Sequence, residues 1–228
     1  MIATPHVPLW LRRQIIVWSV YAWTFFGLAV TVFVYGAVRM IEPICSSGPC
    51  VLYPARQMVV LSPILILVRE SYEQDDDQHN SLAATRNLGF LLYIIHLALS
   101  YALFGVCIDP VNIVYSCAVI TVLLLPSVFI RWHARGLQYY KAVFDISSIV
   151  CLTINLVLRN VLETSQAVIP MLVFHVLSMI SFVGAFTITL SEMERYMTVA
   201  RIKRTAIVMY CHLNLMHYSI LYMWYSPW

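Results

Sequence analysis

The chain has 228 residues, of which 61% are hydrophobic and 11% are charged, whereas soluble domains carry about 25% charged residues. This composition excludes a sizeable soluble domain, and we expect an integral membrane protein. The net charge of +3 comes from Lys and Arg beside apolar runs, so it indicates membrane topology and contact with anionic headgroups, not a nucleic-acid partner.

Seven apolar runs divide the chain, and each is long enough to cross a hydrocarbon core of about 30 Å as a helix. The runs are 15–38, 51–68, 88–107, 111–130, 142–158, 167–190 and 205–224. They predict an all-α membrane protein in which residues 1–228 form a single seven-helix transmembrane domain. The first run is too long for an ordinary signal-peptide core, so we expect it to act as an uncleaved signal anchor.

Basic residues gather in every second gap between these runs. Eleven of the fourteen Lys and Arg lie in one alternating set of segments: Arg12, Arg13, Arg69, Arg86, Arg131, Arg135, Lys141, Arg195, Arg201, Lys203 and Arg204. The other set contains only Arg39, Arg56 and Arg159. The positive-inside rule therefore predicts a cytoplasmic N-terminus and a lumenal or extracellular C-terminus. We expect the membrane to be an endomembrane (endoplasmic reticulum, Golgi or endolysosome) or the plasma membrane.

Two gaps between the runs have a distinctive composition. The first contains Cys45 and Cys50 around a Ser-Ser-Gly-Pro turn, on the side that topology assigns to an oxidising compartment. This favours a short-loop disulfide, with two free thiols as the alternative. The second gap carries an acidic run from Glu70 to Asp77, which lacks the spacing and the glycine of a calcium loop. We interpret this run as a solvated loop.

The fifth apolar run carries the most informative polar pattern. At about 100° per residue, its polar side chains share one helical stripe. They are Asp145, Ser148, Asn155, Arg159 and Glu163. A charged group facing lipid near the bilayer centre is unfavourable by about 2.5 to 3.5 kcal/mol, so we expect this stripe to face the bundle interior. It is either a hydrated ion path or a set of interhelical hydrogen bonds.

Histidines also lie at membrane depth, and His212 in the last run is one candidate for a proton-sensitive element beside the stripe. The alternative is a neutral histidine that hydrogen-bonds a neighbouring helix. The chain contains no HExxH, paired CxxC, GxSxG or phosphate-binding glycine loop. We therefore predict no catalytic residues, no metal site and no cofactor.

Five segments carry a resemblance to a known family. They read RRQIIVWSVYAWTFFGLAVTVFVYGAV, HNSLAATRNLGFLLYIIHLALSYALFGVC, SCAVITVLLLPSVFIRW, VFHVLSMISFVGAFTITLSEMERY and AIVMYCHLNLMHYSILYMW. In their order and spacing they resemble the Bax-inhibitor, or Lifeguard, superfamily of seven-span proteins. They are most similar to its divergent, cytomegalovirus-type herpesvirus members.

The resemblance implies a latch in which two aspartates, on helices six and seven, engage an arginine at the end of helix two and gate a calcium leak. By register the arginine corresponds to Arg69, and the aspartate positions fall at Thr189 and His212. A threonine and a histidine cannot share a proton or bind a cation as two neighbouring carboxylates do. The sequence therefore departs from the family at the latch.

These observations predict a non-enzymatic, viral-type multispan protein that modulates host responses. The resemblance implies altered trafficking or degradation of host membrane proteins, immune evasion or damped cell-death signalling. We expect contacts with the lipid bilayer and with host membrane proteins through transmembrane helices, and the pattern is compatible with a homo-oligomer. The alternative function is a pH-sensitive leak for calcium or another cation, through the stripe and His212.

Overall fold

The computed structural model describes residues 9–41, 61–72, 83–105, 108–130, 133–134, 136–161, 164–196 and 201–224. Regular structure within these ranges is helical, which confirms the predicted all-α fold class. The helices are α1 (Leu9–Ile41), α3 (Leu61–Tyr72), α4 (Ala83–Gly105), α5 (Pro110–Ile130), the short 3-10 helix η2 (Leu137–Tyr140), α6 (Lys141–Val161), α7 (Thr164–Tyr196) and α8 (Ile202–Trp224). Each predicted apolar run overlaps one of the seven α-helices.

Among the described residues, four helical segments are long and apolar enough to cross a membrane: Leu11–Met40, Pro110–Ile130, Leu137–Leu158 and Val168–Met193. They belong to α1, α5, α6 with η2, and α7. Large apolar side chains on their outer faces are exposed, among them Trp18, Phe33, Phe129 and Ile169. Contiguous apolar surface of this kind is typical of helices whose outer faces contact lipid.

Some helices are longer than the apolar runs that predicted them. The run 15–38 lies within α1, which has 33 residues, and the run 167–190 lies within α7, which also has 33. An apolar run measures how much of a helix contacts hydrocarbon, whereas the backbone hydrogen bonds continue into polar flanks such as the Ser-Glu-Met-Glu-Arg-Tyr end of α7.

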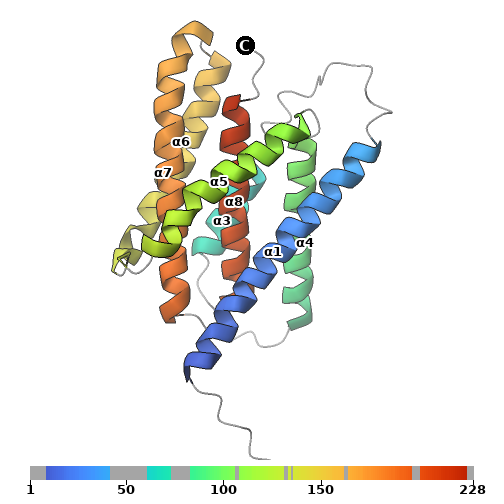
Figure 1. Ribbon diagram of the computed structural model, residues 1–228, viewed down its shortest axis with the longest axis vertical. Helices are drawn as coiled ribbons and strands as arrows, with labels where there is room; N and C mark the ends of the chain where they lie inside the picture. The colour runs from blue at the N-terminus through green and yellow to red at the C-terminus, as the bar shows by residue number, and fades with distance from the viewer. Residues whose placement is uncertain are drawn as a thin grey trace, which may run out of the picture.

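Helix α8 lies in the middle of the bundle, between the pair α6 and α7 and the pair α1 and α4, and α5 crosses it at a slant (Figure 1). It packs against α1, α3, α4, α5 and α7. Because neighbours surround it, α8 is buried on nearly all sides over residues 206–221. This explains how a helix with two histidines and an asparagine can be the core of a membrane bundle: its polar groups meet protein and not lipid.

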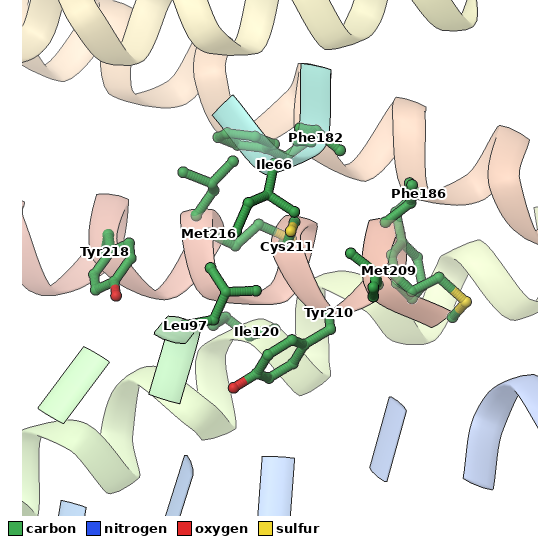
Figure 2. Packing of buried hydrophobic residues seen from close by; sticks show 14 of the residues in the cluster. Ile66, Leu97, Ile120, Phe182, Phe186, Met209, Tyr210, Cys211, Met216 and Tyr218 are labelled. Carbon is green, nitrogen blue, oxygen red and sulfur yellow. The ribbon is translucent and has the colours of Figure 1, made fainter. Parts of the chain in front are cut away.

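The apolar core is built around the same helix. Figure 2 shows Ile66 of α3 and Phe182 of α7 on one side of α8, with Leu97 of α4 and Ile120 of α5 on the other. All four side chains are buried. The core therefore forms where four helices converge on a fifth.

Helices α6 and α7 form a closely packed antiparallel pair. Phe144 lies level with Gly184, and the Ser178 hydroxyl donates to the Ser148 carbonyl oxygen at 3.1 Å. This pairing turns the polar stripe of α6 toward α7 and α8.

Candidate functional site

The polar stripe of α6 lies inside the bundle. Asp145 is 2% exposed, Ser148 is fully buried and Asn155 is 1% exposed. The stripe follows from helical geometry, because residues three, four or seven apart lie on the same face. The Ser148 hydroxyl satisfies its donor within the helix, because it donates to the Asp145 carbonyl oxygen at 2.7 Å.

Asp145 meets His212 of α8. The imidazole Nε2 lies 2.9 Å from the Asp145 Oδ1, and the imidazole is fully buried. The other ring nitrogen, Nδ1, lies 2.9 Å from the carbonyl oxygen of Val208. A carbonyl oxygen only accepts, so Nδ1 carries a proton.

This arrangement sets the proton count of the pair. With Nδ1 protonated, a hydrogen bond between Nε2 and Oδ1 requires one more proton, held by either atom. The pair is then an imidazolium with a carboxylate, or a neutral imidazole with a carboxylic acid, and both forms are neutral overall. The shared proton belongs to the pair and not to one residue. A buried pair of zero net charge is compatible with a low-dielectric interior.

Further polar contacts continue along the interface of α6, α7 and α8. At one end the Lys141 ammonium contacts the Glu192 carboxylate at 3.2 Å, and these side chains are 20% and 33% exposed. Deeper in the bundle, His175 Nδ1 lies 3.0 Å from the Ser219 hydroxyl. We call the whole set the polar seam: Lys141, Asp145, Ser148 and Asn155 of α6, His175, Ser178 and Glu192 of α7, and His212 and Ser219 of α8.

Three buried atoms of the polar seam have no hydrogen-bond partner among the described residues. They are Oδ2 of Asp145 and both side-chain amide atoms of Asn155. Leaving a buried donor or acceptor unpaired destabilises a protein by about 1 to 3 kcal/mol. Such atoms are where buried water is expected, because internal water usually hydrogen-bonds otherwise unpaired polar groups.

The remaining predicted members of the stripe are only partly described. The backbone of Arg159 belongs to α6, but its side chain lies outside the described residues, as does all of Glu163. The proposed disulfide partners Cys45 and Cys50 also lie outside them, and so does the acidic run beyond Tyr72.

The three positions that the sequence resemblance would assign to a latch each have another partner. The guanidinium of Arg69 donates to the Tyr93 hydroxyl of α4. The Thr189 hydroxyl donates to the Ala185 carbonyl oxygen at 2.9 Å, within its own helix. His212 is bonded to α6 through Asp145. The sequence alone does not identify Asp145 as the partner of His212.

Sequence reasoning missed the α7 half of the polar seam. Its signal is present in the sequence: His175, Ser178, Thr189 and Glu192 are three, eleven and three residues apart, which places them on one helical face, within about 100° of one another. Apolar residues between them hide the pattern in a hydropathy scan. Glu192, near the end of α7, pairs with Lys141 of α6.

A second polar cluster lies on another side of α8. His217 Nε2 hydrogen-bonds the Ser116 hydroxyl of α5, and the Tyr101 hydroxyl of α4 lies 3.4 Å from His217 Nδ1. Nearby, Arg39 of α1 donates to the Tyr35 hydroxyl at 2.9 Å and to the carbonyl oxygen of Ile108. These contacts join α1, α4, α5 and α8 near the start of α5.

Among the described residues, no group of three or more His, Cys, Asp or Glu side chains could hold a metal ion. The chemistry that the polar seam offers is therefore proton exchange and hydrogen bonding. No family model, curated protein or solved structure matches this chain.

Proposed function

We propose that the chain is a seven-span membrane protein with a cytoplasmic N-terminus and a C-terminus in the lumen or outside the cell. Four long apolar helices and the alternation of basic segments support this topology. Helices α3, α4 and α8 supply the other three crossings. Burial of α8 accounts for its greater polarity.

We propose that this protein is not an enzyme and that it modulates its host cell through transmembrane contacts with host membrane proteins. The observation that supports this most is the outer surface of α5. Of its 21 residues, the buried ones are Ser116, Ile120 and Ser127, so most of the helix faces outward. Association in lipid depends on packing between such faces. Altered trafficking or degradation of the partner is the outcome that the family resemblance suggests.

A photo-crosslinking amino acid at Val122, on the exposed face of α5, tests this function in transfected membranes. The matched control is Ile120, which is buried on the opposite face of the same helix. We expect a specific host membrane protein to crosslink from position 122 and not from 120, and its surface abundance to change when the chain is expressed. Absence of a specific partner, together with unchanged surface proteins, would defeat this proposal.

A pH-sensitive cation leak is the second candidate, and the Asp145–His212 contact favours it. Ionisable residues inside membrane bundles are rare, and where they occur they often mark ion pathways or proton relays. The test is ion flux into proteoliposomes that contain the purified chain, measured at neutral and at acidic pH. No flux of any ion at either pH would remove this candidate.

A further inference from the structure

We infer that the polar seam between α6, α7 and α8 conducts protons and not metal cations. This inference rests on the leak candidate and specifies which ion passes. The contacts of Asp145, the burial of the polar seam and the unpaired atoms along it each support it.

The charge of the interior argues against a metal cation. Calcium takes six to eight oxygen ligands, usually with several carboxylates. Asp145 is the only carboxylate among the deeply buried described residues, and His212 already neutralises it. A calcium ion bound at Asp145 would disrupt the neutral Asp145–His212 pair and would have too few oxygen ligands.

The packing of the polar seam also favours protons over metal cations. Asp145, Ser148, Asn155, Ser178 and His212 are all 0–2% exposed, so the polar seam is closed to bulk solvent. A hydrated cation needs an open passage wider than a water molecule. A proton moves between hydrogen-bonded groups and single buried waters, and needs no such opening.

The polar seam has the layout of a relay. It begins at the partly exposed Lys141–Glu192 pair, and Asp145 lies four residues further along α6, which is about 6 Å. Ser148 with Ser178 and then His175 with Ser219 follow deeper in the bundle. Asn155 lies ten residues, about 15 Å, beyond Asp145, so the polar seam covers about half of a 30 Å hydrocarbon core.

The proton balance closes at the Asp145–His212 pair. At rest the pair holds one shared proton between Nε2 and Oδ1. A second proton arriving through water at the unpaired Oδ2 gives an imidazolium and a carboxylic acid, with a net charge of +1. Release of one proton toward Ser148 and Asn155 restores the neutral pair. Only O–H and N–H bonds form and break, and no oxidant or reductant takes part.

Three other titratable groups on α8 or on the helices packed against it hydrogen-bond residues away from this pair. Tyr210 hydrogen-bonds Thr31 of α1, His217 hydrogen-bonds Ser116 of α5, and Arg69 of α3 hydrogen-bonds Tyr93. The titratable groups along the polar seam itself are the Lys141–Glu192 pair and His175.

The experiment uses the full chain in proteoliposomes loaded with a pH-sensitive dye, with potassium and valinomycin to clamp the membrane potential. Parallel vesicles contain a calcium dye. We expect an imposed acid gradient to collapse at least tenfold faster than in protein-free vesicles, with no calcium entry.

Two variants separate conduction from folding. Asp145→Asn keeps the hydrogen bond to His212, because the amide donates to Nε2. The amide cannot release a proton, so proton flux should fall to the level of protein-free vesicles. Asn155→Leu removes unpaired buried amide atoms, so flux should fall at least tenfold while the thermal midpoint stays or rises. Ser147→Ala, a hydroxyl lost from the same helix pair but off the polar seam, should leave flux unchanged.

The possible outcomes are distinct. Calcium flux without proton flux overturns this inference and leaves a cation leak standing. No flux of any ion overturns the leak as well. Proton flux that survives in both Asp145→Asn and Asn155→Leu also overturns the inference, because those protons would follow another route.

Discussion

Gly184 of α7 lies directly against the ring of Phe144 of α6: a β-carbon at Gly184 would be 2.7 Å from Cδ1 and 2.8 Å from Cε1. Real Cβ atoms essentially never approach so closely. We predict that Gly184→Ala forces the two helices apart and lowers the free energy of unfolding by about 1 to 3 kcal/mol. Unfolding by denaturant in detergent micelles measures this change.

Gly89 of α4 provides the matched control, because a β-carbon there would meet nothing within 4 Å. Gly89→Ala should be neutral or stabilise the helix by up to about 1 kcal/mol. Phe144→Ala, by removing the ring, should make Gly184→Ala tolerable in the double variant. If Gly184→Ala and Gly89→Ala have equal effects, the close approach of α6 and α7 is wrong.

The Asp145–His212 contact predicts different effects for two substitutions of the same aspartate. Asp145→Ala leaves the His212 imidazole buried without its partner, and we expect a loss of about 3 to 5 kcal/mol of stability. Asp145→Asn restores a donor for Nε2 and should lose less than half of that amount. Thermal unfolding of both purified variants in the same detergent compares them, and equal losses would contradict the hydrogen bond.

The Tyr210 hydroxyl of α8 hydrogen-bonds the Thr31 hydroxyl of α1, which also donates to the Gly27 carbonyl oxygen at 2.9 Å. Interhelical hydrogen bonds in membrane bundles contribute about 0.6 to 1.7 kcal/mol. Tyr210→Phe should therefore destabilise by this amount, and Thr31→Val by a similar amount. A double-mutant cycle isolates the pairwise energy, and a coupling near zero would show that the contact contributes nothing.

The proposed topology predicts where glycans attach. An Asn-X-Ser/Thr acceptor inserted after Ser47 should be glycosylated in mammalian membranes, because the charge pattern places that segment in the lumen. The same acceptor inserted after Asp76 should stay unmodified. A mobility shift that disappears on glycosidase treatment is the measurement, and the reverse pattern would invert the topology.

The helices themselves were largely predictable, because apolar runs of membrane length identify them without any tertiary information. The run 15–38 indicated α1 and the run 205–224 indicated α8. Helix ends were less predictable: α7 continues to Tyr196 because helical hydrogen bonding does not stop where lipid contact does.

The site was predictable only in part. Spacing along α6 placed Asp145, Ser148 and Asn155 on one face, since that depends on a single helix. It could not identify His212 as the partner of Asp145, because the rotation and tilt of α8 relative to α6 arise from the packing of all its neighbours. The same limit applies to Arg69, whose contact with Tyr93 depends on how α3 meets α4.

The enclosed position of α8 has a consequence for biogenesis. Five other helices supply the surroundings that make its histidines and Asn214 tolerable in a membrane, and those helices precede it in the chain. A ribosome-bound intermediate without α8 would expose unpaired Asp145 and the apolar side chains that α8 covers in the folded protein, among them Ile66, Leu97 and Phe182. We expect α8 to leave the translocon slowly, because its polar residues require contacts with the neighbouring helices. A chaperone that binds this intermediate should therefore recognise the surface that α8 covers in the folded protein.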